Sequence, residues 1–336
     1  MQIINTPEPF SPAFGEILYA VALTEEERGA EIAIFNSTGQ AMIGIKKATE
    51  VPEFSLNVAD YLRSQVAIEP LPRQICRIIE APQRLFRSLI AHGDWTASQV
   101  HTAGIVPVGM NEAMCEPGLR SLGPDEQDEI DWVAGVGTHF ARALFPVTGK
   151  DPLEIQLGRI EIAEPRMLAL VVNSDDLDLG LQQRGWQWTD FDRFTVEIHF
   201  NYQKITAFEY IIRPSNRSKT RLAWWNRQGA IDFHSFESTT REERLFEKRE
   251  AAVGDRRLPV STQCQFVRTI HTAHTTREQA LRLSQIAGSP QVWIVEGDTF
   301  IPVEIRSEKP FLIADSGETA IELQVVGTEP LLFQSF

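Results

Sequence analysis

The chain has 336 residues, which is enough for two or three domains with cores of their own. Hydrophobic residues make up 43% and charged residues 23%, values typical of a soluble globular protein and not of a fibrous or disordered one. The formal net charge of −14 argues against direct nucleic-acid binding, because the phosphate backbone would repel the protein.

The cysteines and the first residues indicate the compartment. Cys76, Cys115 and Cys264 are far apart and form neither a disulfide framework nor a C-x-x-C pair. The start, MQIINTPEPF, lacks the basic and apolar regions of a secretion signal. No apolar run is long enough to cross a bilayer, so we expect no membrane insertion and folding in a reducing cytoplasm.

Residues 1–108 are predicted to form an antiparallel β-sandwich domain. Short apolar runs separated by turn-forming or charged clusters are typical of such a fold. The predicted strands are 17–22, 30–35, 41–46, 54–58, 75–80, 85–91 and 100–108, with a turn at 92–94.

Residues 109–150 are rich in Asp, Glu, Pro and Gly, and we interpret them as an acidic linker or excursion. The part from 125 to 133 could form a short helix. The carboxylates have no EF-hand spacing, so a solvated loop is favoured over a calcium site.

Residues 151–336 are predicted to form a β-rich α+β domain with two short helices. Strands are expected at 153–162, 167–172, 194–200, 206–212 and 320–326. Phe194, Val196 and Ile198 alternate with polar residues, which indicates a strand with one buried face. The last residues, Leu331 to Phe336, are largely apolar and are expected to pack against something.

Two copies of a strand-helix-glycine-strand unit are predicted within this domain. In the first, Leu222 to Arg227 suit a short helix that ends at Gly229, followed by a strand from Ile231. A hairpin with a glycine bulge at 226–229 is the alternative. In the second, a strand at 264–270 precedes a helix capped at Thr275 and closed by Gly288. Both glycines are expected to have positive φ.

The motifs of this region resemble the C-terminal part of phage and prophage tail proteins. The resemblance rests on the paired Trp224 and Trp225, the turn at Gly229, and the aromatic strand after it. It also rests on Ser289-Pro290-Gln291-Val292-Trp293 and Phe300-Ile301-Pro302-Val303. It covers roughly residues 195–336.

The resemblance implies a non-enzymatic structural subunit of a phage tail, at the baseplate or tail tip, or of a phage-tail-like contractile injection system. Its partners would be copies of itself and other tail or baseplate proteins. It would be made in the bacterial cytoplasm and end in a virion tail or injection particle. Segments 109–150 and 330–336 are expected to contact neighbouring chains. The candidate structural and assembly residues are Trp224, Trp225, Gly229, Phe233, Gly288, Pro290, Trp293, Pro302 and Phe336.

No motif predicts catalytic, cofactor-binding or metal-binding residues. Gly135 and Gly137 lack the third glycine of a dinucleotide fingerprint, and neither a phosphate loop nor a G-x-S-x-G elbow occurs. Cys264, His271 and His274 lack a fourth zinc ligand. The segment 174–178 is favoured as a turn over a cation loop, and Asp232 with His234 as an outward polar face. We therefore expect folding to need no metal or nucleotide.

The main alternative function is a carbohydrate-binding or adhesin module with a host-surface glycan as partner. Exposed tryptophans could stack on sugar rings, and the candidates are Trp186, Trp188, Trp224 and Trp225. Core packing is favoured for each of them, because an indole buries a large area. A third possibility, an enzyme with an unrecognised site, has no support in the sequence.

Overall fold

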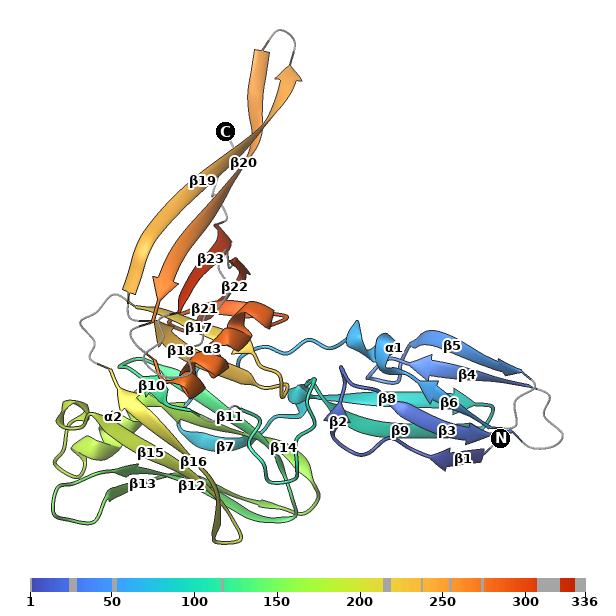
Figure 1. The fold of residues 1–336 in the computed structure, drawn as a ribbon, viewed down its shortest axis with the longest axis horizontal. Coiled ribbons are helices and arrows are strands. Elements are labelled where there is room, and N and C mark those ends of the chain that lie inside the picture. The colour runs from blue at the N-terminus through green and yellow to red at the C-terminus, as the bar shows by residue number, and fades with distance from the viewer. Residues whose placement is uncertain are drawn as a thin grey trace.

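The structure, a computed structural model, describes residues 2–23, 29–49, 53–115, 118–213, 219–236, 238–253, 256–272, 275–306 and 321–329. The described residues lie mostly in β-strands, with three short α-helices, which confirms the predicted mainly β fold with an α+β C-terminal part. Figure 1 shows an N-terminal group of strands at one end, a middle group, and a C-terminal group from which a long hairpin rises.

The N-terminal group is a sandwich of two sheets, with strand orders β1-β3-β6 and β2-β9-β8-β4-β5. Tyr19, Ile34 and Ile90, from strands of both sheets, share one core, to which the short helix α1 adds Leu62. The predicted sandwich is confirmed. The elements are β1 (Gln2–Asn5), β2 (Ser11–Pro12), β3 (Leu18–Ala22), β4 (Gly29–Phe35), β5 (Met42–Thr49), β6 (Glu53–Asn57), α1 (Ala59–Arg63), β8 (Leu85–His92) and β9 (Trp95–Thr102).

The middle group has two sheets, with orders β11-β14-β7 and β10-β16-β15-β12-β13. Their facing sides enclose the largest core, which includes Trp132, Phe145 and Leu170. The elements are β7 (Arg77–Glu80), η1 (Pro82–Arg84), β10 (Arg120–Leu122), β11 (Gln127–Ala134), β12 (Gly137–Phe145), β13 (Leu153–Ile162), β14 (Arg166–Asn173), α2 (Ser174–Gln182), η2 (Trp188–Asp190), β15 (Arg193–Phe200) and β16 (Gln203–Ile212).

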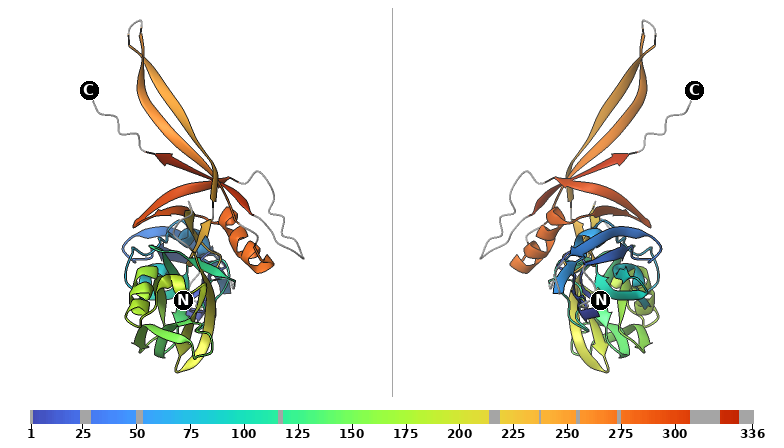
Figure 2. Two further views of the ribbon diagram at one scale, coloured as in Figure 1. Left: turned by 90° about the vertical axis from the view of Figure 1, so that its left-hand side faces the viewer. Right: turned by 90° about the vertical axis from the view of Figure 1, so that its right-hand side faces the viewer.

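The C-terminal group is one sheet of order β18-β17-β21-β22-β23-β20-β19 with helix α3 beside it (Figure 2). Trp224 and Leu222 of the sheet pack with Leu283 and Ile286 of α3. The elements are β17 (Thr220–Trp225), β18 (Ile231–Phe236), β19 (Ser238–Val253), β20 (Arg256–His271), α3 (Arg277–Gly288), β21 (Val292–Glu296), β22 (Thr299–Arg306) and β23 (Glu322–Glu329).

Strands β19 and β20 form a hairpin that extends well past the sheet. Strand β23 pairs with β20 only from His271 to Cys264. Beyond Cys264 the described hairpin is a ribbon of two strands, residues 247–253 and 256–263, which we call the arm (Figures 1 and 2). At about 3.3 Å per residue it reaches about 25 Å beyond the sheet. The mixed charges of residues 241–257 suit a solvated loop in the sequence, yet residues 241–253 lie in β19. Charged residues at consecutive positions of the sequence conceal the two-residue apolar period of a strand.

The acidic segment 109–150 is neither a linker nor a solvated excursion. It contains β10, β11 and β12, and no helix forms at 125–133. On β11, Ile130 and Trp132 alternate with Glu129 and Asp131, and all four are buried. The acidic side chains face cations from other elements, which local sequence does not reveal.

The first predicted helix, at 222–227, is also wrong, and the hairpin alternative is correct. Residues 220–225 form β17, which pairs with β18 on one side and β21 on the other. Pairing with two strands provides backbone hydrogen bonds that a helix of one turn cannot match. The second predicted helix is confirmed as α3, although Thr276 is its N-cap in place of Thr275.

Candidate functional site

Tryptophan and phenylalanine side chains of the C-terminal sheet join it to the N-terminal half of the chain. The indole N–H of Trp225 donates to the carbonyl of Ala103 at 3.0 Å, and the ring of Phe14 packs edge-on at 5.6 Å. Phe233 and Trp293 extend this contact. We call it the junction core; its buried members are Ile68, Phe86, Ala103, Ala223, Trp225, Ile231, Phe233 and Trp293.

Trp224 lies on the opposite face of the same strand, as strand alternation requires. It is fully buried, and the guanidinium of Arg282 on α3 lies 5.5 Å from its ring. Trp188 is also buried, in the middle core. Three of the four tryptophans considered for glycan stacking are therefore core residues, and Trp186 packs partly buried against the middle core.

The turn between β17 and β18 is docked on the segment that follows β9. The side-chain oxygen of Asn226 accepts the N–H groups of Gln228 at 3.0 Å and Ala230 at 3.1 Å. Gly229 has φ of +92°, which confirms its predicted positive φ. A Cβ on Gly229 would lie 2.3 Å from the backbone nitrogen of Gly104. The turn is thus part of a backbone-to-backbone contact that only glycine permits.

A buried group of charges, which we call the central charge cluster, joins the middle and C-terminal sheets. Arg120 of β10 pairs with Asp128 of β11 at 2.8 Å and with Asp232 of β18 at 2.5 Å. The hydroxyl of Tyr210 donates to Asp128 at 2.9 Å, and Arg282 lies 3.7 Å from Asp232. Each of these side chains is at most 1% exposed. The cluster links four sheet strands and a helix from distant parts of the chain.

A second buried group pairs one guanidinium with two carboxylates. Arg84 lies 2.7 Å from Glu129 and 3.4 Å from Asp131, and the Leu71 N–H donates to Glu129 at 2.6 Å. Burial raises the pKa of Glu129 to about 8, with Asp131 adding to the rise and Arg84 opposing it. Burial raises the pKa of Asp131 as well. The two carboxyls therefore share a proton at neutral pH.

This pair predicts a contribution to stability that falls as pH rises from 6.5 to 8. The folded Glu129 keeps its proton up to a pKa of about 8, whereas the unfolded carboxyl, with its ordinary value of 4.5, is ionised. The contribution of the pair to the free energy of unfolding should then drop by up to about 1.4 kcal/mol per pH unit. Burial also lowers the pKa values of His101, His139 and His234, so their contributions to stability rise with pH until the unfolded histidines are deprotonated, at about pH 7.5. These contributions are the same in the parent and in an Asp131→Asn variant, so they cancel in the comparison.

Urea unfolding of the parent and of Asp131→Asn at several pH values in this range is the measurement. The substitution removes the neighbouring negative charge, which should lower the pKa of Glu129 and flatten the slope. Asp60→Asn is the control, because Asp60 is 84% exposed and should leave the slope unchanged. An unchanged slope in Asp131→Asn would contradict the shared proton.

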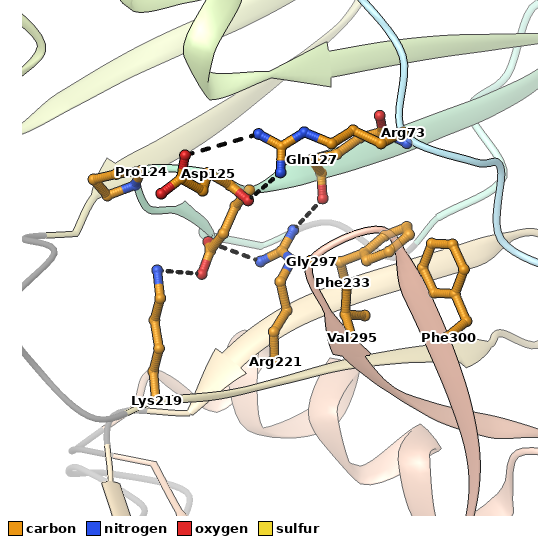
Figure 3. A pocket seen from close by; sticks show the side chains of 11 residues that line it. Arg73, Pro124, Asp125, Gln127, Lys219, Arg221, Phe233, Val295, Gly297 and Phe300 are labelled. Carbon is orange, nitrogen blue, oxygen red and sulfur yellow. Dashed lines mark hydrogen bonds and ion pairs between the residues drawn. The ribbon is translucent and has the colours of Figure 1, made fainter.

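A cavity of about 280 Å³ opens between the β10–β11 connection and the C-terminal sheet, and we call it the junction cavity (Figure 3). Its wall contains cations, carboxylates and apolar side chains; its lining residues are Arg73, Pro124, Asp125, Glu126, Gln127, Lys219, Arg221, Phe233, Val295, Gly297 and Phe300. Burial alone would raise the pKa of Glu126, but Arg221 and Lys219 hold it below its ordinary value. The carboxylate is therefore ionised at neutral pH.

Most of the other predicted assembly residues lie near the junction core. Pro302 on β22 pairs opposite Trp293, and Pro290 lies in the short connection between α3 and β21. Gly288 is the last residue of α3, and its predicted positive φ is wrong, since the helix leaves through an extended Ser289. Phe336 and the segment 330–336 lie outside the described residues.

The structure corrects two further interpretations. Asp232 and His234 do not form an outward polar face, because both are buried between the sheet, α3 and β10. Segment 174–178 is the start of α2, whose N-cap is Asn173, and not a free turn. His274 lies outside the described residues. Within the described ranges no three potential ligand side chains converge on a metal site, and no helix is long and apolar enough to cross a membrane.

Sequence reasoning missed the arginines that organise the interior. Arg84, Arg120 and Arg282 are fully or almost fully buried, although arginine is rarely buried without a partner. A usable signal was β11 itself, because Ile130, Trp132 and Ala134 recur at every second position among its carboxylates. A strand with that pattern, buried on both faces, places carboxylates in the interior, where cationic side chains must pair with them.

No protein-family model matches this chain, and no curated protein matches it. Among solved structures, one that it matches is a crystal structure of Dpr2 Ig1-Ig2 in complex with DIP-Theta Ig1-Ig3. The identity is 9%, and the match covers 98% of this chain and 90% of that chain. The TM-score is 0.23, which is too low to carry an argument about fold or function.

Proposed function

We propose that this protein is a non-enzymatic structural subunit of a phage tail or of a phage-tail-like injection machine. It acts as a repeated copy at the baseplate or tail tip. The arm is the observation that carries the proposal, together with the resemblance of residues 195–336 to tail proteins. A ribbon of two strands is only marginally stable in water alone. A neighbouring chain that pairs with it provides the missing contacts.

The hairpin offers two kinds of contact to a neighbour. Strand β19 is the edge of its sheet, so along its length one side of its backbone has no strand partner among the described residues. Such an edge can accept an extended strand of another chain. At the base of the arm, Leu245 and Phe246 are 50% and 59% exposed on opposite faces. Neighbours on both faces would bury them.

An assembly subunit must hold its contact arm in a fixed direction, and the three groups of strands, which we call the body, are joined firmly enough to do so. The junction core and the central charge cluster join the three groups of strands, so the arm leaves the body in a defined direction (Figure 1). The acidic segment 109–150, which was expected to contact a neighbouring chain, forms strands of the middle sheets. In this proposal the arm makes that contact. The glycan-binding alternative loses support, because the buried tryptophans cannot stack on a sugar.

Electron microscopy of particles produced with the genes that flank this one tests the proposal. Antibody or gold labelling of a tag on this protein should mark one end of a tail-like particle. Particles that assemble fully, and carry no label in any position, would overturn it.

Shortening the arm should abolish assembly without unfolding the body. Joining Phe246 to Cys264 by an Asn-Gly turn removes residues 247–263, none of which pairs with β23. We expect the melting temperature of the isolated protein to change by less than about 4 °C, the equivalent of 1 kcal/mol or less in a large domain. Incorporation into particles, measured by immunoblot after sedimentation, should fall at least tenfold. Normal incorporation of the shortened chain would exclude the arm from assembly.

A further inference from the structure

We propose that the junction cavity binds a carboxylate carried on an apolar body about the size of one aromatic ring. This site goes beyond the structural role proposed above, and its test uses the isolated protein, so either can fail without the other. The argument rests on which hydrogen-bonding groups of the cavity wall are already used, on its apolar side and on its volume.

The only carboxylate buried in this wall, among the described residues, is already saturated. Glu126 accepts the Gly123 N–H at 2.7 Å, a guanidinium N–H of Arg221 at 3.1 Å and the Ser235 hydroxyl at 2.8 Å. The ammonium of Lys219 lies 2.6 Å from Oε1, the same oxygen that accepts the Ser235 hydroxyl. With three hydrogen bonds and one ion pair around its two oxygens, Glu126 is already fully engaged and is a poor acceptor for a ligand's donor.

The hydrogen-bonding groups of the wall that remain without a partner among the described residues are donors. The Nε–H of Arg221 is buried and has no hydrogen-bond acceptor among the described residues. The Lys219 ammonium is close enough to Glu126 for ion pairing but is not aligned for a hydrogen bond. A buried donor without an acceptor costs about 1–3 kcal/mol. A ligand that supplies oxygen atoms removes this cost, whereas a cationic ligand adds to it.

Charge within the lining favours an anion over a neutral acceptor. Arg73, Lys219 and Arg221 contribute three positive charges, against the two carboxylates of Asp125 and Glu126. Arg73 pairs with Asp125 and also with Asp175 and Asp298, which lie outside the lining, so its charge is already compensated. The cations that remain to meet a ligand are Lys219 and Arg221, which share the single carboxylate of Glu126. One negative charge on the ligand therefore balances this group, and it offers no second uncompensated cation for a dianion such as a phosphate.

The opposite side of the cavity is apolar and small. Phe233, Val295 and Phe300 face the charged side chains across the space shown in Figure 3. The guanidinium of Arg221 lies 5.2 Å from the ring of Phe233, so the charged and apolar walls meet at this edge of the cavity. A volume of about 280 Å³ is at the low end for ligand sites. It accommodates one ring with a short acidic chain, such as an arylalkanoic acid or an acidic residue beside an aromatic one.

Ligand-observed NMR titration of the full chain with 3-phenylpropanoate tests the site. We expect saturable binding with a Kd on the order of 0.3 mM, from the usual affinity per non-hydrogen atom. The neutral amide and the corresponding amine, 3-phenylpropanamide and 3-phenylpropylamine, should bind at least tenfold more weakly, as should propanoate. If the amine or the amide binds as tightly as 3-phenylpropanoate, the ligand needs no negative charge and the proposal is wrong. If propanoate binds as tightly, the ligand needs no aromatic ring and the proposal is also wrong.

Two variants locate the binding. Lys219→Gln should weaken 3-phenylpropanoate at least fivefold, and Phe300→Ser should do so as well. Lys204→Gln is the matched control: Lys204 also pairs with a glutamate, at 3.4 Å, but on β16 and outside the cavity. Unchanged affinity in both cavity variants, with unchanged melting temperatures, would overturn the assignment.

The ligand has two chemical sources that the same assay separates. A free organic acid should bind more tightly than the capped dipeptide acetyl-Phe-Asp-amide. The reverse order would assign the cavity to an acidic side chain of a partner protein. Failure of both ligands to bind would overturn the proposal.

Discussion

Replacing Gly229 with alanine is expected to destabilise the protein by on the order of 3 kcal/mol. About 1 kcal/mol comes from a φ of +92°, which an alanine adopts only with strain. The rest comes from a methyl group placed 2.3 Å from the Gly104 nitrogen. Backbone atoms on both sides cannot rotate away, so the turn must separate from the segment after β9. Urea unfolding measures the loss.

The second glycine of the predicted pair provides the control. Gly288 lacks a positive φ, and a Cβ there would meet nothing within 4 Å. Gly288→Ala should therefore be neutral or stabilising by up to about 1 kcal/mol, because it restricts the unfolded chain. Gly104→Ala should resemble Gly229→Ala, since its Cβ would lie 2.4 Å from the Gln228 carbonyl oxygen. Similar losses at Gly229 and Gly288 would contradict the docked turn.

Elements with a clear local pattern could be predicted from the sequence. Strands β13 to β16 have alternating or continuous apolar residues, and the helix α3 has an N-cap and a 3.6-residue apolar period. The sandwich followed from the spacing of short apolar runs. In each case the residues that decide the structure are neighbours in the chain.

Elements decided by distant partners could not be predicted. The segment Leu222 to Arg227 suits a helix by itself, but β18 and β21 approach from both sides and make it a strand. The sequence of β11 suggests a solvated segment because the cations that pair with its carboxylates lie on other elements, Arg84 on η1 and Arg120 on β10. The cavity unites residues from positions 73 to 300, so no local motif marks it.

Replacing Arg120 with methionine should cost about 3–5 kcal/mol of stability, because it removes one partner of a buried ion pair. Methionine fills a similar volume, but it leaves Asp128 buried without a cation, and Asp232 with only Arg282 at 3.7 Å. Carboxylates in that situation take up protons. The variant should therefore regain stability relative to the parent as the pH is lowered towards 5, a pattern that lost packing alone does not produce.

An exposed ion pair of similar length serves as a control, because it shows how much stability an ion pair contributes when it is not buried. Arg193 and Glu209 lie 2.7 Å apart, but their side chains are 64% and 48% exposed. Arg193→Met should cost less than about 1 kcal/mol, because water already solvates both ions. Adding Asp128→Asn to Arg120→Met should recover part of the loss, since the amide can still accept the Tyr210 hydroxyl. If Arg120→Met and Arg193→Met cost the same, the central charge cluster does not hold the middle and C-terminal sheets together. The direction of the arm would then depend on the junction core alone.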